Sequence, residues 1–228
     1  MITFFEISKF RYGLSPGLNF YRTLEQGGNF YFISGVVSGS GFEKMSGQLT
    51  QYFLNQVIKD ISELDVIQGI SDNAEIIFDL AQAHLHNDFS AETCAWLILV
   101  LVKERKAWIA WSSGNIVLLY SNKSIKEKTN AHFCNVWFPE REKIFLNKGI
   151  GCGYENCKAE MISRPWDLED RDKIIFINQG IVETISSESL VTSLEKEDLY
   201  IAASKIISSK ESSRLLCDFL VIIDMSFK

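Results

Sequence analysis

The middle of the sequence is a series of apolar segments that are too short for typical helices and are separated by polar turns. Residues Ala95–Val102 are almost continuously apolar, and two more apolar runs follow the polar Lys103–Lys106, at Trp108–Trp111 and Ile116–Tyr120. Runs of this length with many β-branched and aromatic residues are typical of strands. The short connections predict hairpins and antiparallel strands rather than βαβ units. We expect the first run to lie in a sheet that is buried on both faces.

Helical patterns lie on both sides of these strands. Apolar residues recur at helical spacing in two segments before them and two segments after them, at 45–61, 74–85, 187–194 and 197–207. Further strands are expected at Phe30–Val37, Ile174–Ile177 and Phe219–Ile223. This order predicts an α+β fold in which an antiparallel β-sandwich of two sheets is flanked by helices on both faces.

Composition limits the class of protein. The chain has 228 residues, a net charge of −6 and three prolines, so we expect a single domain over residues 1–228 and no nucleic-acid surface. The longest apolar stretch is too short to span a bilayer, and the first ten residues do not read as a signal peptide. We therefore expect a cytoplasmic protein with no membrane partner, in which the five cysteines are reduced thiols.

Several strand-to-turn junctions form an ordered series along the chain. They are Asn19–Tyr21, Val36–Phe42, Ala91–Thr93, Ser112–Asn115, Thr129–His132, Asp172–Gly180 and Cys217–Asp218. In order and spacing this series resembles the signature turns of the metal-dependent type 2C serine/threonine protein phosphatases, the PPM family. The resemblance covers nearly the whole chain and implies the same two-sheet fold. It also implies an ancestral site with two divalent metals, at which a metal-bound water attacks a phosphoryl group.

The resemblance also implies that this chain is a degenerate member, because carboxylates are missing where the metals are held. The positions that correspond to the metal site hold Tyr21, Ser38, Gly39, Ser113, Gln179, and either Cys217 or Asp218. The substrate-binding arginine of the family corresponds to Pro16, and a histidine of many members corresponds to Ser40. Mg²⁺ and Mn²⁺ prefer charged oxygen ligands. We therefore expect no catalytic residue, no bound metal and no cofactor at this vacated site.

Other residue clusters have simpler interpretations. His84, His86 and Asp88 can share a metal only on an extended segment, and a polar helix end is the preferred interpretation. The possible zinc ligands His132, Cys134, Cys152 and Cys157 lack a standard spacing, so isolated thiols are preferred. The acidic run Asp167–Asp172 is interpreted as a solvated turn. Two readings stay open for Trp137, Phe138 and Trp166, which form either an exposed partner surface or the packing of a long loop.

We expect a catalytically inactive pseudophosphatase that binds or regulates another protein. The alternative is a divergent metal-dependent phosphatase that hydrolyses phosphoproteins, with Mn²⁺ or Mg²⁺ held by Asp218, Glu183 and other carboxylates. A weaker alternative is a sensor that binds a small ligand in the vacated cleft. Calorimetric titration with Mn²⁺ separates the first two hypotheses.

Overall fold

The computed structural model describes most of the chain as two compact units. The described residues are 2–10, 21–38, 46–64, 70–89, 93–112, 115–130, 133–138, 141–146, 150–151, 160–162, 164–178, 185–195, 198, 201, 206 and 217–226. Unit 1 consists of Met1–Gly17, Asn115–Ala131 and Trp166–Lys228, and unit 2 consists of Leu18–Gly114 and His132–Pro165. Each unit is therefore assembled from separate stretches of sequence. That these stretches form one domain over residues 1–228 stays a prediction.

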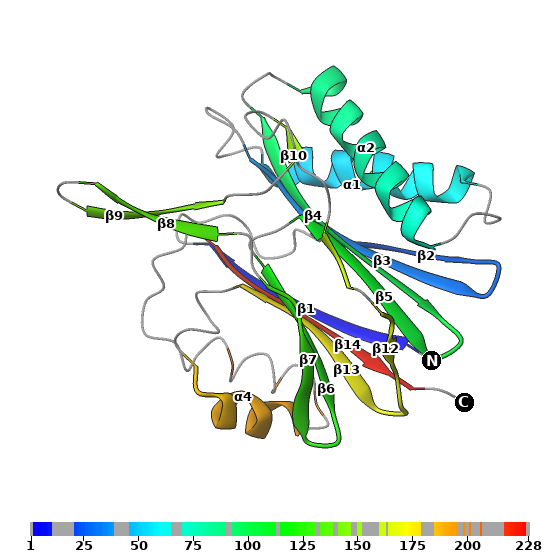
Figure 1. Ribbon diagram of the computed structural model, residues 1–228, viewed down its shortest axis with the longest axis vertical. Coiled ribbons are helices and arrows are strands. Elements are labelled where there is room, and N and C mark those ends of the chain that lie inside the picture. Colours follow the sequence, from blue (N-terminus) through cyan, green and yellow to red (C-terminus); the bar gives the residue numbers. More distant parts are fainter. Residues whose placement is uncertain are drawn as a thin grey trace. The chain divides into compact units, whose positions relative to one another are not determined.

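Unit 2 contains an antiparallel sheet with two helices on one face (Figure 1). The strands follow the order β11-β5-β4-β3-β2, with β10 beside β4. Their bounds are β2 Tyr21–Gln26, β3 Asn29–Ser38, β4 Cys94–Lys103, β5 Lys106–Ser112, β10 Ile150–Gly151 and β11 Glu160–Met161. The helices are α1, Ser46–Glu63, and α2, Ile70–Asp88. A separate hairpin pairs β8, Phe133–Phe138, with β9, Arg141–Leu146.

The apolar faces of α1 and α2 form one core with alternate residues of the sheet. Phe53, Val57 and Ile61 recur along α1, and all three are buried with Leu97 and Leu99 of β4. The α1 residues have the spacing of one face of an amphipathic helix, and the β4 residues have the two-residue alternation of one face of a strand. Ile98 and Val100, whose side chains alternate with these leucines, are also buried, which confirms that β4 is buried on both faces.

Two glycine positions in unit 2 are required by the backbone. The turn from β2 to β3 uses Gly27 and Gly28 with φ of 58° and 77°, as a tight two-residue hairpin requires. Within β3, a Cβ added at Gly35 would lie 2.7 Å from the carbonyl oxygen of Trp96. Only glycine therefore permits the close approach of β3 to β4 at this point.

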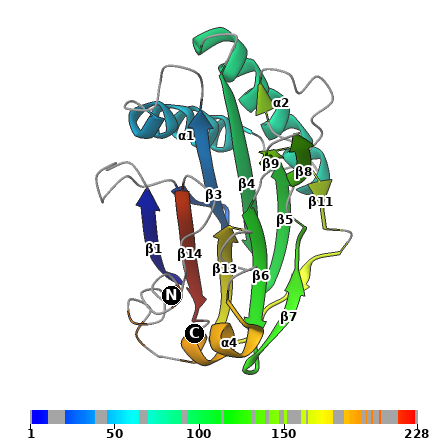
Figure 2. The same cartoon turned by 90° about the vertical axis from the view of Figure 1, so that its left-hand side faces the viewer.

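Unit 1 contains the second antiparallel sheet, in the order β1-β14-β13-β6-β7 (Figure 2). The strands of this sheet are β1 Ile2–Phe10, β6 Asn115–Ser121, β7 Ser124–Lys128, β13 Asp172–Asn178 and β14 Cys217–Met225. The two-residue strand β12, Trp166–Asp167, precedes β13 in the sequence but is not a member of this sheet. The helix α4, Ser187–Leu194, buries Leu190 and Leu194 in a core with residues of β6, β13 and β14. Its N-terminus is capped by Ser186, whose hydroxyl accepts a hydrogen bond from the amide of Ser189 at 3.1 Å.

The predicted fold class is confirmed: the chain is α+β, with two antiparallel sheets and helices packed on each. Three of the four predicted helices correspond to α1, α2 and α4, whereas most of 197–207 lies outside the described residues. No helix in the described part of the chain is both long enough and apolar enough to cross a membrane.

Candidate functional site

The predicted site positions of unit 2 map to one end of its sheet. Tyr21 is the first residue of β2, Ser38 is the last residue of β3, and Ser112 is the last residue of β5. Because neighbouring strands run antiparallel, the start of β2 and the ends of β3 and β5 lie at the same end. Gly39 and Ser113 directly follow two of these strands and lie outside the described residues.

Tyr21 is the predicted site residue whose side chain is described best. Its ring stacks on the ring of Phe32, with centroids 5.5 Å apart and an angle of 15° between the planes. Phe32 is fully buried in the sheet, and Tyr21 is half-buried. Stacking on a core residue gives the ring a packing role and brings no negative charge to the end of β2. Tyr21 is thus a poor ligand for a hard cation at this position.

The junction between β3 and α1 is held by a buried hydrogen bond. The backbone amide of Val37 donates to the hydroxyl oxygen of Thr50 at 2.9 Å, and Thr50 is fully buried. This bond joins the end of β3 to the second turn of α1, so the two elements are fixed on either side of residues 39–45. Sequence reasoning did not identify Thr50. The available signal was a hydroxyl residue among the apolar positions of an amphipathic helix.

The predicted site positions of unit 1 also map to one end of a sheet. Asn178 is the last residue of β13, and Cys217 and Asp218 are the first two residues of the neighbouring strand β14. The register pairs Ile177 with Leu220, which brings the end of β13 next to the start of β14. The backbone of Cys217 and Asp218 is described but their side chains are not, and Gln179 lies outside the described residues.

Among the predicted metal-site positions, Tyr21 is the one whose side chain is described, and its neutral phenol does not match the ligand preference of a hard divalent cation. In the part of the chain that the structure describes, no three His, Cys, Asp or Glu side chains are grouped so that they could hold a metal ion. The hydroxyl of Ser112 is buried and has no hydrogen-bond partner among the described residues, but it is neutral. By strand alternation it shares the helix-covered face of β5 with Ala110.

The junction after β7 is also organised by a threonine. The amide of Val117 donates to the side-chain oxygen of Thr129 at 2.9 Å, and the amide of Thr129 donates to the carbonyl of Val117 at 2.9 Å. Thr129 is buried, so its role within the Thr129–His132 segment is structural. Of the possible zinc ligands, His132, Cys152 and Cys157 lie outside the described residues, as does the side chain of Cys134.

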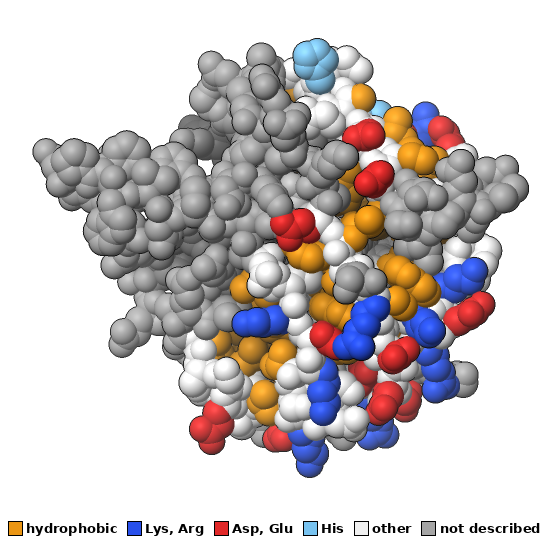
Figure 3. Space-filling model, viewed as in Figure 1, with side chains coloured by type: hydrophobic (Ala, Val, Ile, Leu, Met, Phe, Trp, Pro, Cys, Tyr) orange, Lys and Arg blue, Asp and Glu red, His pale blue; other side chains and the backbone are white. Residues whose placement is uncertain are grey.

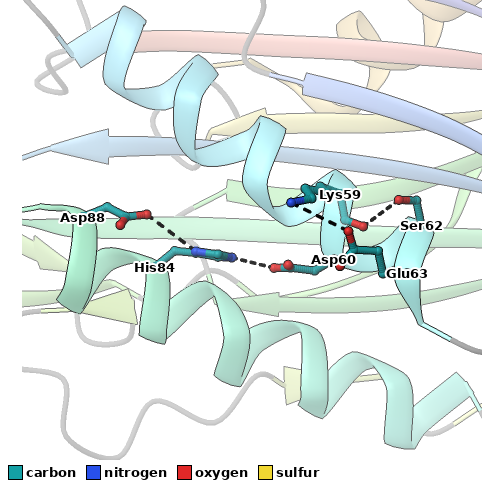
Figure 4. Close-up of polar contacts among 6 residues, drawn as sticks. All are labelled: Lys59, Asp60, Ser62, Glu63, His84 and Asp88. Atoms are coloured by element: carbon teal, nitrogen blue, oxygen red, sulfur yellow. Dashed lines mark hydrogen bonds and ion pairs between the residues drawn. The ribbon is translucent and has the colours of Figure 1, made fainter.

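His84 joins the two helices of unit 2 (Figure 4). Its Nε2 lies 2.7 Å from Oδ2 of Asp60 in α1, and its Nδ1 lies 3.6 Å from Oδ2 of Asp88. The segment is helical to Asp88, which confirms the predicted polar helix end. The helical pattern alone did not identify Asp60 as the partner, because that contact depends on how α1 and α2 pack.

Trp166 is not part of an exposed surface. The residue is 5% exposed, so the reading in which it lies on a partner surface is wrong, and its apolar body is packed instead. Trp137 and Phe138 are paired in β8 through their backbones, and their side chains are not described. The partner surface proposed for these two residues stays a prediction.

The acidic run Asp167–Asp172 is a turn, but Asp172 is not solvated as we expected. It is 3% exposed, and its Oδ2 accepts a hydrogen bond from the amide of Glu169 at 2.8 Å. Burial raises the pKa of the Asp172 carboxyl, while hydrogen bonds from Glu169 and Ser121 act in the opposite direction. This carboxylate closes the turn before β13, at the opposite end of that strand from the predicted site.

The proteins that this chain matches were found among solved structures. No family model matches the sequence. No curated protein sequence matches it either. The serine/threonine phosphatase of S. agalactiae matches with a TM-score of 0.76 and 12% identity, over 98% of this chain and 99% of that one. The PPM Ser-Thr phosphatase MsPP of Mycobacterium smegmatis matches with a TM-score of 0.65 and 13% identity, over 99% and 98%. The phosphatase PstP/Ppp of Mycobacterium tuberculosis matches with a TM-score of 0.63 and 13% identity, over 99% of each chain.

Proposed function

Because the chain has the fold of the PPM serine/threonine phosphatases over nearly its whole length, we propose that it is a catalytically inactive relative that acts by binding another protein. The observation that carries this proposal is the packing of Tyr21. Where the resemblance places a metal-binding carboxylate, this chain has a phenol ring that stacks on a core phenylalanine. A half-buried ring that packs on the core in this way serves the fold and contributes no charge to a metal.

The proposal is supported by what the reaction needs. A structural neighbour, the catalytic domain of PstP, was solved in complex with two manganese ions. Two such cations require several anionic oxygens, whereas the corresponding positions here have phenol, hydroxyl and amide side chains. At the positions that correspond to the metal site, Asp218 at the start of β14 is the carboxylate that remains. One carboxylate does not hold two divalent ions, so we expect neither metal binding nor phosphate release.

The test is calorimetric titration of Mn²⁺ into the metal-free full chain and into a variant in which the carboxylates are restored. That variant carries Tyr21→Asp, Ser38→Asp, Ser113→Asp and Gln179→Asp. A control variant, Tyr52→Asp with Ile201→Asp, adds carboxylates at two exposed positions. We expect no binding by the natural chain or the control at millimolar Mn²⁺, and binding by the restored variant.

Tight stoichiometric binding of Mn²⁺ by the natural chain, with release of phosphate from a phosphoprotein, would overturn the proposal in favour of a divergent phosphatase.

The proposal that the chain binds another protein has its own test. A photoreactive amino acid at position 137 in β8 is expected to crosslink a protein partner in cells, while the same group at the exposed Tyr52 is not. Equal crosslinking from both positions would argue against a partner surface at Trp137 and Phe138.

A further inference from the structure

A pocket of about 290 Å³ lies in unit 2, against the helix-covered face of the sheet. Its lining includes Leu99 and Leu101 of β4, Trp108 of β5, Ile77 of α2, Met161 of β11, and Arg164. All of these residues belong to unit 2. The pocket is separate from the sheet end that carries Tyr21 and Ser38, so its role does not depend on the proposed function.

The pocket exists because the helices cover the sheet incompletely. Leu97, Leu99 and Leu101 alternate along β4 and share one face. Leu97 is fully buried, whereas Leu99 and Leu101 keep 5% and 4% of their surface exposed. Trp108 is only partly buried, and Met161 is 37% exposed. An apolar surface that the fold leaves partly open in a concave place gains free energy when an apolar ligand covers it.

The charge around the pocket restricts the class of ligand. Among the described residues that line it, Arg164 carries the one charge, and none is acidic. Arg164 is exposed, so a ligand in the pocket can reach its guanidinium from the solvent side. A guanidinium is suited to carboxylates, because its planar N–H groups match the two carboxylate oxygens. Figure 3 shows hydrophobic side chains of described residues that reach the surface beside Lys and Arg side chains.

We infer that this pocket binds a small molecule with an apolar body and one carboxylate, such as a short acyl or aryl carboxylic acid. The volume is at the lower end of the range of about 300–1,000 Å³ that is usual for small-molecule sites. An α-helix with its side chains is about 10–12 Å wide, so a pocket of this size does not admit a helix from a partner protein. The apolar body lies on Leu99, Leu101 and Trp108, and the carboxylate faces Arg164.

The experiment is a titration of the full chain with octanoate, followed by methyl NMR of its isoleucine and leucine residues. Octanol and octylamine are the neutral and cationic probes. We expect saturable shifts at Ile77, Leu99 and Leu101, with octanoate bound more tightly than octanol and octylamine bound least. Arg164→Gln is expected to weaken octanoate about two- to fivefold, which is the effect of an exposed ion pair, and to leave octanol unchanged.

Lys59→Gln is the matched control, because it removes an equally exposed cation from α1, away from the pocket. We expect it to leave the affinity for octanoate unchanged. Met161→Trp, which adds bulk at the rim, is expected to reduce the affinity for both octanoate and octanol. The inference is overturned if octanoate shifts methyl groups throughout the molecule without saturation, if the pocket methyl groups do not respond, or if the control weakens octanoate as much as Arg164→Gln does.

Discussion

At the scale of single residues, the polar groups that are buried in the sheets hold turns in place. Thr50 and Thr129 each accept a hydrogen bond from a strand amide at 2.9 Å, and Asp172 accepts one from the turn before β13. The two threonine contacts satisfy backbone donors that would otherwise be buried without a partner. Asp172 differs from the two threonines because its side chain titrates, and so its contribution to stability depends on pH.

The stability of the chain should reflect the raised pKa of Asp172. Burial favours the protonated carboxyl in the folded state, so this group contributes stability that is fully present below its unfolded pKa, near 3.8. That contribution is lost as the pH rises through the folded pKa. Asp172→Asn removes the titration and keeps an oxygen that can accept the Glu169 amide. We expect the variant to gain stability relative to the natural chain as the pH rises, as measured by urea unfolding at several pH values. A difference in stability that is the same at every pH would contradict this explanation.

At the scale of elements, the antiparallel sheets depend on tight hairpins. The β2–β3 turn uses two glycines, but the β4–β5 turn places Glu104 and Arg105 at φ of 50° and 58°. Asn122 and Lys123 do the same between β6 and β7, with φ of 49° and 59°. Residues with a Cβ are strained in this left-handed region. The sequence thus accepts a cost at two of these three turns.

Relief of the strain in the β4–β5 turn should stabilise the protein. We expect the double variant Glu104→Asn with Arg105→Gly to increase the free energy of unfolding by about 1 kcal/mol, because Asn-Gly is the preferred pair for this turn. Chemical denaturation with urea measures the change. Gly28→Ala, which introduces a Cβ at φ of 77°, is the opposite control and should lower stability by a similar amount. Lower stability in the Asn-Gly variant would mean that the side chains of this turn contribute more than its backbone strain costs.

The elements that sequence reasoning found are those with continuous apolar runs. The strands β3, β4, β13 and β14 all contain the apolar segments predicted for them, and each extends only a few residues further. The strands β2 and β7 were missed because they pair on one side only, are half-exposed and have the mixed sequences YRTLEQ and SIKEK. The pattern of apolar residues reflects burial, so a strand that is only partly buried lacks the pattern by which it would be predicted.

The placement of the predicted site residues at strand ends followed from the sequence, whereas their contacts did not. Tyr21, Ser38, Cys217 and Asp218 fall at strand ends because signature turns follow or precede apolar strands. The stacking of Tyr21 on Phe32 depends on the register between β2 and β3, which no local pattern specifies. The sequence left two readings open for Trp166, because a tryptophan in a loop region has the same local sequence signal whether it is packed or exposed; the structure shows that it is buried.

At the scale of the whole molecule, the chain alternates between its two units. It passes from unit 1 to unit 2 after Gly17, returns after Gly114, and crosses twice more, after Ala131 and after Pro165. No single cut in the sequence therefore yields either unit as one continuous piece. In the sheet of unit 1, β1 pairs with β14 and β6 pairs with β13, so strands that are far apart in the sequence are neighbours in the sheet.

This arrangement predicts the pattern of hydrogen exchange. The strands β4, β13 and β14 are each paired on both sides, whereas β2 and β7 are paired on one side in their sheets. We expect amide exchange to be slowest in β4, β13 and β14 and clearly faster in β2 and β7, because opening an edge strand breaks fewer contacts. Exchange followed by mass spectrometry resolves these segments. Protection in β2 or β7 equal to that in β4 would show that those edges are covered.

The pairing of β1 with β14 has a consequence for biosynthesis. Nine register pairs join these strands, from Ile2 with Met225 to Phe10 with Cys217, so β1 leaves the ribosome more than two hundred residues before its partner. At about 5–20 residues per second, this interval is on the order of 10 to 40 seconds. During that time the apolar segment of β1 has no native strand to pair with, and it is a candidate substrate for chaperones that hold nascent chains. The sheet of unit 1 is completed only when β14 has been made.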